Sequence, residues 1–273
     1  MIIEEALRTA AIELSNVAER PRLEAEILMS FYLGQERIWL HMNSNKEIDN
    51  HEEFFRLVKR RKDHEPIEYI TRRVSFYDIE LEVGPGVLIA RPETELLVDT
   101  AANIIRKHNL EVICEIGIGS GAVSIMLAKM FPRLQIIATD ISEIALNYAK
   151  KNIERYGFEN RIELYKTNIL DNININIDII VSNPPYICKE YDLPQSVLFE
   201  PKNALIGGEF GDELLREIIL TAKNRNINHL VCEMGYDQRE LISNFCKSIN
   251  LKEPVFYKDL ANLDRGFYLN LKK

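Results

Sequence analysis

Residues 112–121 read VICEIGIGSG, and this stretch decides the fold. The first five residues are apolar except Glu115 and have the character of a buried strand, and three glycines follow in G-x-G-x-G spacing. Residues 122–130 then have the apolar composition of a helix. Because glycine allows a tight turn and the close approach of a ligand, strand, turn and helix together predict an α/β unit with a ligand at the turn.

The alternation of strand and helix continues to the end of the chain. Apolar runs predict further strands at residues 135–139, 162–165, 177–182, 229–233, 254–257 and 267–271. Helical spacing predicts helices at residues 142–156, 214–224 and 238–249, and another that opens with Arg91-Pro92-Glu93-Thr94-Glu95. Such an order forms a mostly parallel sheet with helices on both faces, so the fold class is α/β and Rossmann-like.

The first part of the chain has a different pattern. Residues 1–65 carry apolar side chains at helix spacing and predict a helical domain of three helices. Residues 68–70, 74–77 and 79–83 alternate with period two, as strands do, and predict a β-hairpin linker over residues 66–86. The remaining residues, 87–273, form the predicted α/β domain.

Composition limits the class of protein. The net charge of −8 argues against a general nucleic-acid binder, which needs cations to displace phosphate counterions. The four cysteines lack C-x-x-C spacing and the five histidines are scattered, so we expect reduced cysteines and no metal site. The start of the chain is acidic, and no apolar run reaches the roughly 18 residues of a membrane span. These features predict a cytoplasmic protein.

A cluster of four cations, Lys59, Arg60, Arg61 and Lys62, ends the third predicted helix. Cations at a helix C-terminus complement its dipole and form a solvated face. The alternative is a contact with an acidic or RNA-bearing partner.

The glycine turn has two acids beside it. Asp140 ends the next predicted strand, where a carboxylate can accept both hydroxyls of a ribose. Glu115 lies at the end of the first strand, where it would repel a pyrophosphate but attract an amino group, directly or through water. The two acids together therefore suit a ligand that joins an adenosine to an amino acid, and that ligand is S-adenosylmethionine. The alternative is a structural glycine turn with an acid downstream by chance.

A second distinctive turn, Asn183-Pro184-Pro185-Tyr186, follows the strand predicted at residues 177–182. Proline has no N–H and a fixed φ, so the turn ends the strand without starting a helix. The Asn183 side-chain oxygen and the carbonyls of Asn183 and Pro184 are acceptors, and Tyr186 adds a flat face. This set suits a planar –NH2 group, although Asn-Pro also occurs in ordinary surface turns.

The chain resembles the release factor glutamine methyltransferases (PrmC/HemK), within the class I S-adenosylmethionine-dependent methyltransferases. The resemblance covers nearly the whole chain and is carried by residues 22–28 (RLEAEIL), 66–70, 87–95 (VLIARPETE), the glycine turn and residues 183–187 (NPPYI). It also includes Glu200-Pro201, Ala204-Leu205 and Gly207-Gly208. It implies an N-terminal helical domain, a β-hairpin and a seven-stranded methyltransferase domain. It further implies methylation of the glutamine in the Gly-Gly-Gln motif of peptide-chain release factors.

The resemblance also assigns residues. It places the cofactor at Gly117, Ile118, Gly119, Ser120, Gly121 and Asp140, with Asn168 where the family has an acidic or aromatic residue near the adenine. Glu115, from its charge, and Asn183, next to the substrate amide, complete the expected cofactor site. It places the substrate amide at Asn183, Pro184, Pro185 and Tyr186, of which Asn183, Pro184 and Tyr186 are the candidate catalytic residues. Two departures, Ala90 for proline and Glu68 for glutamine, lie outside this predicted centre.

The expected partner is a release factor, docked by residues 1–65, and the expected product of the cofactor is S-adenosylhomocysteine. We expect a monomer that needs no direct nucleic acid and no membrane. Three alternatives remain: a ribosomal-protein glutamine methyltransferase, an adenine-N6 DNA or RNA methyltransferase that stacks a flipped base on Tyr186, and a cofactor-binding protein without turnover. The adenine enzyme would need a basic surface.

Overall fold

The structure is a computed structural model that describes residues 1–272. Its contacts divide the chain into two compact units, one formed by Met1–Arg73 with Leu193–Phe199 and the other by the rest of the chain. The domain boundaries expected after residues 65 and 86 stay predictions.

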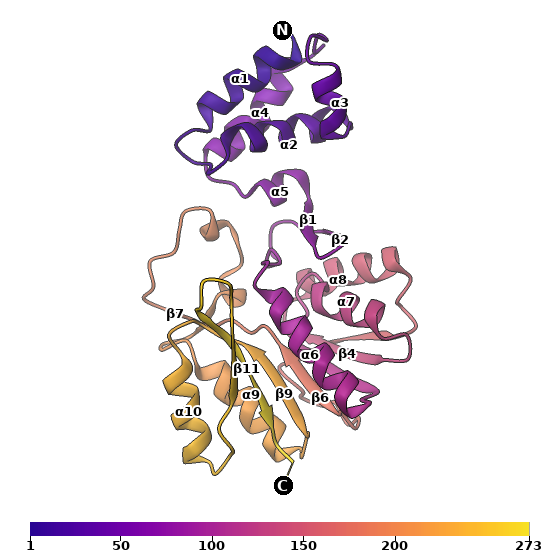
Figure 1. The fold of residues 1–273 in the computed structure, drawn as a ribbon, viewed down its shortest axis with the longest axis vertical. Helices are drawn as coiled ribbons and strands as arrows, with labels where there is room; N and C mark the ends of the chain where they lie inside the picture. The colour runs from indigo at the N-terminus through magenta and orange to yellow at the C-terminus, as the bar shows by residue number, and fades with distance from the viewer. Residues whose placement is uncertain (273) are drawn as a thin grey trace. The chain divides into compact units, whose positions relative to one another are not determined.

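The first unit is helical, as predicted. Its helices are α1 (Ile3–Glu13), α2 (Pro21–Leu33), α3 (Arg37–Met42), α4 (His51–Lys62) and α5 (Ile67–Thr71) (Figure 1). Leu7, Leu28 and Phe54 are fully buried in its core. The sequence did not predict α3, because six residues are too short to show a helical period.

The basic cluster at the end of α4 is largely paired inside this unit. Arg60 Nε donates to Glu65 (2.7 Å), Arg61 Nε donates to Glu24 (2.6 Å), and Lys62 lies 3.4 Å from a Glu13 carboxylate oxygen. Arg61 also donates to the Val17 carbonyl (3.1 Å). These contacts favour the structural interpretation of the cluster over a partner site.

Residues 68–70 were expected to form a strand, and this expectation is wrong. They lie in α5, where the Pro66 carbonyl accepts hydrogen bonds from the N–H groups of Tyr69 and Ile70 (3.0 and 3.1 Å). A three-residue run fits both the helical and the strand period, so the pattern could not separate them. The hairpin itself is confirmed, with β1 (Arg73–Phe76) paired to β2 (Ile79–Glu82).

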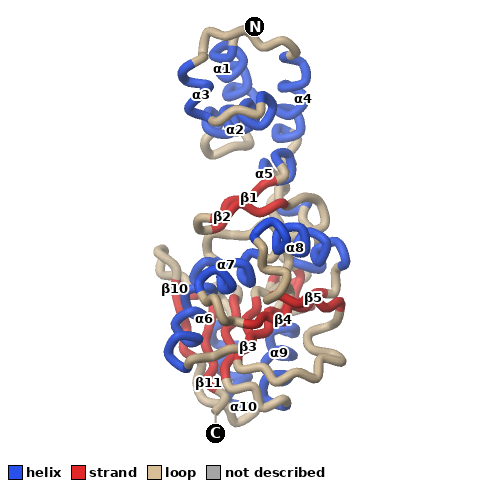
Figure 2. Tube along the Cα trace, turned by 90° about the vertical axis from the view of Figure 1, so that its right-hand side faces the viewer, coloured by secondary structure: helices blue, strands red, loops and turns tan. Residues whose placement is uncertain are grey.

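The second unit contains the predicted seven-stranded sheet, whose strands are drawn in red in the lower part of Figure 2. Its strand order is β10-β11-β9-β6-β3-β4-β5. Its strands are β3 (Val112–Ile116), β4 (Gln135–Asp140), β5 (Ile162–Lys166), β6 (Ile179–Ser182), β9 (His229–Glu233), β10 (Val255–Lys258) and β11 (Asp264–Asn270). The strands from β5 to β9 in this order run parallel, and β11 pairs antiparallel with β9. A separate ladder of β7 (Ile187–Cys188) and β8 (Ile206–Gly208) was not predicted.

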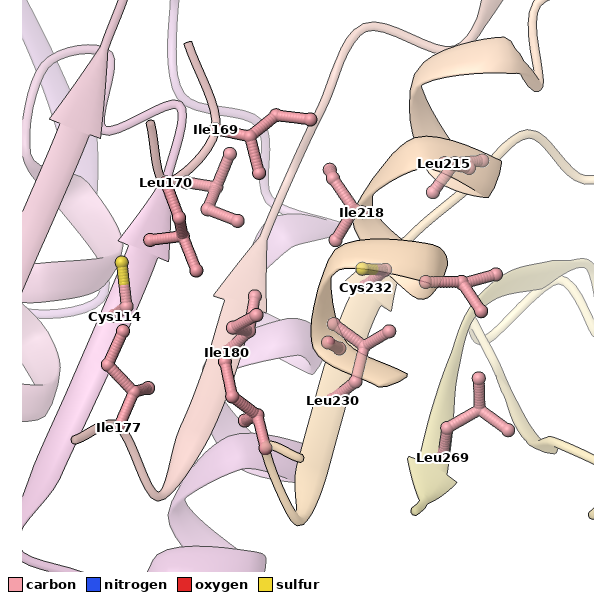
Figure 3. Close-up of a cluster of buried hydrophobic side chains, with 14 of the residues drawn as sticks. Cys114, Ile169, Leu170, Ile177, Ile180, Leu215, Ile218, Leu230, Cys232 and Leu269 are labelled. Carbon is pink, nitrogen blue, oxygen red and sulfur yellow. The ribbon is translucent and has the colours of Figure 1, made fainter. Parts of the chain in front are cut away.

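Helices cover both faces of this sheet. On one face lie α6 (Thr94–His108), α7 (Ala122–Met130) and α8 (Glu143–Tyr156). Helix α6 contacts β6, β9 and β11, whereas α7 and α8 contact β4. On the other face lie α9 (Glu213–Asn224) and α10 (Arg239–Ser248). Figure 3 shows Leu215 and Ile218 of α9 beside Ile180, Leu230 and Cys232 of the sheet, within one buried cluster.

Chain order and sheet order together locate the site. From β3 the chain adds β4 and β5 on one side, and then β6 and β9 on the other. The order in which strands are added to the sheet therefore reverses between β3 and β6. Open α/β sheets bind ligands at such a reversal point, beyond the carboxyl ends of the strands. Among residues 1–272, no helix combines the length and apolar character that crossing a membrane requires.

Asn152 of α8 fixes the hairpin and the glycine turn at once. Its Oδ1 accepts from the Glu82 N–H (2.7 Å), and its Nδ2 donates to the carbonyls of Glu82 and Ser120 (2.9 Å each). The side chain is fully buried. Each of these backbone groups would lose its partner if the amide were removed.

We expect Asn152→Ala to lower the free energy of unfolding by about 2–4 kcal/mol, because buried polar groups are left without partners. Urea denaturation followed by circular dichroism measures the change. Asn147→Ala is the matched control, since Asn147 lies exposed on the same helix. Equal destabilisation by the two variants would contradict the bridging role of Asn152.

Candidate active site

A pocket lies at the reversal point of the sheet, within the second unit. The carboxyl ends of β3, β4 and β6 contribute Ile116, Asp140 and Asn183 to its lining. Further parts of the wall come from residues 86–88, 167–169 and Pro201, Asn203 and Ala204, and from Ala145 of α8 and Leu214 of α9. The strand ends singled out from the sequence therefore meet at one site.

The glycine turn forms one side of the pocket. Gly117 and Gly119 line it, with φ of 75° and 56°, a region that L side chains rarely adopt. A Cβ at Gly119 would meet no atom within 4 Å, so the turn faces open space there. The N–H groups of Gly117 and Ile118 donate to the Thr139 carbonyl (2.8 and 3.0 Å), which ties the turn to β4.

Glu115 does not line the pocket. It is only 3% exposed, and its carboxylate accepts from the Ser124 N–H (2.9 Å) and the Ser124 hydroxyl. Burial raises the pKa of Glu115 to about 8, while these hydrogen bonds oppose the rise. The acid thus lies at the positive end of the α7 dipole. Its expected contact with the cofactor stays a prediction.

Asp140 ends β4 and lines the pocket. Its Oδ2 accepts from the Gly119 N–H (3.1 Å) and its Oδ1 from the Ser142 N–H (2.8 Å). Burial raises the pKa of Asp140, and these backbone bonds act in the opposite direction. Since a carboxylate has about four acceptor sites, both oxygens can still accept hydroxyl groups.

Asn168 also lines the pocket, next to a strained residue. Ile169 has a φ of 46°, which is unusual for a β-branched side chain. Its carbonyl accepts from the Thr139 hydroxyl (2.9 Å), which holds the strained loop against β4. Asn168 is exposed, so its amide can reach a ligand.

The turn Asn183-Pro184-Pro185-Tyr186 forms the opposite side, where Asn183 and Pro185 line the pocket. Asn183 Nδ2 donates to Thr94 Oγ1 (3.0 Å), and within residues 1–272 its Oδ1 has no hydrogen-bond partner. The Tyr186 hydroxyl donates to Glu233 (3.1 Å), and its carbonyl accepts from Gln238 (2.9 Å). The turn is therefore fixed on the side away from the pocket.

Glu200 joins two segments that flank the pocket. It accepts from the Ile89 N–H (2.9 Å) and pairs with Arg91, while residues 86–88 and Pro201 both line the pocket. Only 4% of Glu200 is exposed.

Gly207 lies against the turn from the other direction. A Cβ there would fall 2.4 Å from the Pro185 carbonyl oxygen and 2.9 Å from the Tyr186 Cα. Only glycine permits this close approach. Glu200 and Gly207 lie in stretches that carry the family resemblance, but the sequence alone gave no role to either.

Six of the residues predicted for the site come together in this pocket: Gly117, Gly119, Asp140, Asn168, Asn183 and Pro185. The others do not line it: Glu115, Ile118, Ser120, Gly121, Pro184 and Tyr186. Ile118 and Ser120 are buried, and Gly121 is the N-cap residue that precedes α7, so these turn residues shape the backbone. Across residues 1–272, no cluster of three or more His, Cys, Asp or Glu could hold a metal ion.

Models of known protein families match both the helical part and the α/β part of the chain. The family model "PrmC N-terminal domain" matches residues 5–71, and "Methyltransferase small domain" matches residues 92–206.

Curated relatives match nearly end to end. A release factor glutamine methyltransferase of Clostridium acetobutylicum is 31% identical, over 97% of this chain and 97% of its own. The chain belongs to the release factor glutamine methyltransferases. Further members are those of Coxiella burnetii, 34% identical over 96% of both chains, and Rhodopirellula baltica, 35% identical over 91% of this chain and 88% of its own.

Solved structures confirm the methyltransferase fold. The hMettl16 catalytic domain in complex with MAT2A 3'UTR hairpin 6 superposes with a TM-score of 0.58 at 15% identity, covering 71% of this chain and 76% of its own. A ribosomal protein L11 methylase from Lactobacillus delbrueckii gives 0.51 at 20% identity, covering 71% and 86%. At such identities the likeness shows the fold alone.

Asp140→Ala should weaken the binding of S-adenosylmethionine by about 1.5–3 kcal/mol, the scale of a lost charge-assisted hydrogen bond. The fold should survive, because Asp140 ends its strand. Isothermal titration calorimetry of the folded variant measures the loss. An unchanged affinity would remove the ribose assignment.

Proposed function

We propose that this chain transfers a methyl group from S-adenosylmethionine to the side-chain amide nitrogen of the glutamine in the Gly-Gly-Gln motif of release factors. The observation that carries the proposal is the match over 97% of both chains to a relative named for glutamine methylation of release factors. The pocket supports it, since Asn183, whose Oδ1 can accept from a planar –NH2 group, lines it together with Gly117 and Gly119 of the glycine turn.

The residues present fit S-adenosylmethionine. Gly119 leaves open space at the turn, and Asp140 presents a carboxylate to a ribose. Asn168 lies on the pocket wall, where its side-chain oxygen would accept from an adenine amine. The N-terminal domain of human METTL16, which shares the fold with a TM-score of 0.53 at 15% identity, was solved in complex with S-adenosylhomocysteine. When bound, the cofactor supplies a methyl group already activated by a sulfonium.

The protein's part is then to orient a poor nucleophile, because the amide lone pair is delocalised into its carbonyl. Asn183 Oδ1 and the Pro184 carbonyl would accept the two N–H bonds of the glutamine amide. They would orient its nitrogen for methyl transfer and would stabilise the positive charge that develops there. Such orientation can contribute several of the roughly 7–11 kcal/mol available to well-aligned reactants. Tyr186, held by Glu233 and Gln238, would pack against the flat amide.

The helical unit would dock the release factor, and the protein would act in the cytoplasm as a monomer without direct nucleic acid. The adenine-N6 alternative is not favoured, because the chain is acidic and its basic cluster is largely paired. A ribosomal-protein glutamine methyltransferase would use the same amide chemistry. Labelled S-adenosylmethionine offered in parallel to release factor, ribosomal protein and DNA tests all three, and label on another substrate alone would refute the proposal.

Asn183→Ala should reduce single-turnover methyl transfer to release factor by roughly 10²-fold or more, as for other preorganised polar groups. We expect Asn183→Asp to lose methyl transfer to a similar extent. A carboxylate cannot donate to Thr94, whose hydroxyl already donates to Glu233 (2.8 Å). Cofactor affinity should change less in both variants. A folded Asn183→Ala enzyme with near wild-type turnover would contradict the assignment.

A chain that begins at Val74 should still bind the cofactor and lose most activity on intact release factor. It should keep its activity on a short Gly-Gly-Gln peptide, because the pocket lies wholly in the second unit. Radiolabel transfer to the two substrates separates docking from chemistry. Full activity on intact release factor would show that residues 1–73 are dispensable.

A further inference from the structure

A chain of hydrogen bonds runs behind the Asn183-Pro184-Pro185-Tyr186 turn. Asn183 Nδ2 donates to Thr94 Oγ1 (3.0 Å), Thr94 Oγ1 donates to Glu233 Oε2 (2.8 Å), and the Tyr186 hydroxyl donates to Glu233 Oε1 (3.1 Å). One carboxylate thus connects the first and last residues of the turn, through Thr94 at one end and directly at the other.

The backbone brings these groups together. Glu233 is the last residue of β9, which pairs parallel with β6 so that Cys232 lies opposite Ser182. One step further along each strand are Glu233 and Asn183. Thr94 is the first residue of α6, which contacts both strands.

Burial limits the hydrogen-bond partners of these groups, and the ionised state of Glu233 then sets the direction of each bond. Thr94 is 4% exposed and Glu233 is 2% exposed, so neither can rely on water for hydrogen bonding. Burial raises the pKa of Glu233 to about 7, and in the ionised form, which prevails above that pH, the Glu233 carboxylate only accepts, while a hydroxyl has one hydrogen to donate. Because Thr94 gives its hydrogen to Glu233, it can only accept from Asn183. Asn183 must therefore present Nδ2 to Thr94 and Oδ1 to the opposite side, toward the pocket.

We propose that Thr94 and Glu233 are positioning residues, which act through Asn183 to select a substrate that donates an –NH2 group. The proposal rests on the proposed function in taking a glutamine amide as that substrate. If the Asn183 amide were reversed, it would present its own –NH2 to the pocket. It would then match a carboxylate, such as a glutamate side chain, and repel the amide nitrogen that has to react.

Thr94→Val removes the hydroxyl while keeping the branched shape, and Thr94→Ser keeps the hydroxyl. Thr100→Val is the matched control, since Thr100 lies on the same helix, α6, and does not line the pocket. We expect Thr94→Val to lower kcat on release factor about 10-fold or more, with little change in KM or in cofactor affinity. Thr94→Ser should recover to within about 3-fold of wild type, and Thr100→Val should stay at the wild-type rate.

A double-mutant cycle tests whether Thr94 acts through Asn183. In an Asn183→Ala background, Thr94→Val should cause no further loss of turnover, because the group that it positions is gone. If the fold-losses in turnover of the two single variants instead multiply in the double variant, Thr94 acts independently of Asn183 and the proposal is overturned.

A readout without turnover separates this proposal from the proposed function. The side-chain NH2 signal of Asn183, identified by its loss in Asn183→Ala, should exchange with solvent at least 10-fold faster in Thr94→Val and recover in Thr94→Ser. Unchanged exchange in Thr94→Val would overturn the positioning role, whatever the substrate. If wild-type protein methylates no release factor while the exchange behaves as expected, the proposed function fails and the positioning role stands.

Discussion

The parallel pairing of β3 with β6 is the constraint on which the site depends. Its register sets Ile116 opposite Ser182, so the glycine turn and the Asn-Pro-Pro-Tyr turn leave the sheet side by side. A Cβ added to Gly117 would lie 3.9 Å from the Asn183 carbonyl oxygen. A slip of one residue would turn every side chain of β6 to the other face. Backbone pairing therefore brings together the two turns at which we propose that the methyl donor and its acceptor bind.

Buried polar side chains then fix what the sheet brings together. Glu115, Asn152 and Glu233 are almost inaccessible to water, and each is satisfied by groups on other elements. An unpaired buried carboxylate or amide would cost several kcal/mol, so these side chains permit few alternative arrangements. Burial raises the pKa of Glu115 and of Glu233. The same burial makes the hydrogen bonds of these two side chains difficult to replace by water, and so helps to hold the two turns in place.

Local patterns predicted the elements with the longest periodic runs. The bounds of β3, α7 and β9 follow the apolar runs and glycines of the sequence. The sequence pattern missed α3 and misassigned α5, because both helices are short. It gave no sign of the ladder of β7 and β8, because these short strands pair with each other over a long stretch of sequence. Asp140 and Asn183 could be predicted because each ends an apolar strand. Thr94 and Glu233 could not be paired, since they are 139 residues apart and only the folded sheet brings them together.

The site chemistry alone does not determine the substrate. An acceptor pair beside a flat ring can receive any planar –NH2 group, an adenine amine as well as a glutamine amide. What separates the two is the surface outside the pocket. An adenine in a nucleic acid would need cations that are free to meet phosphates, yet this chain carries a net charge of −8, and Arg60, Arg61 and Lys62 face carboxylates. We therefore infer that substrate choice resides in protein contacts, and that the helical unit, which matches the PrmC N-terminal model at residues 5–71, supplies them.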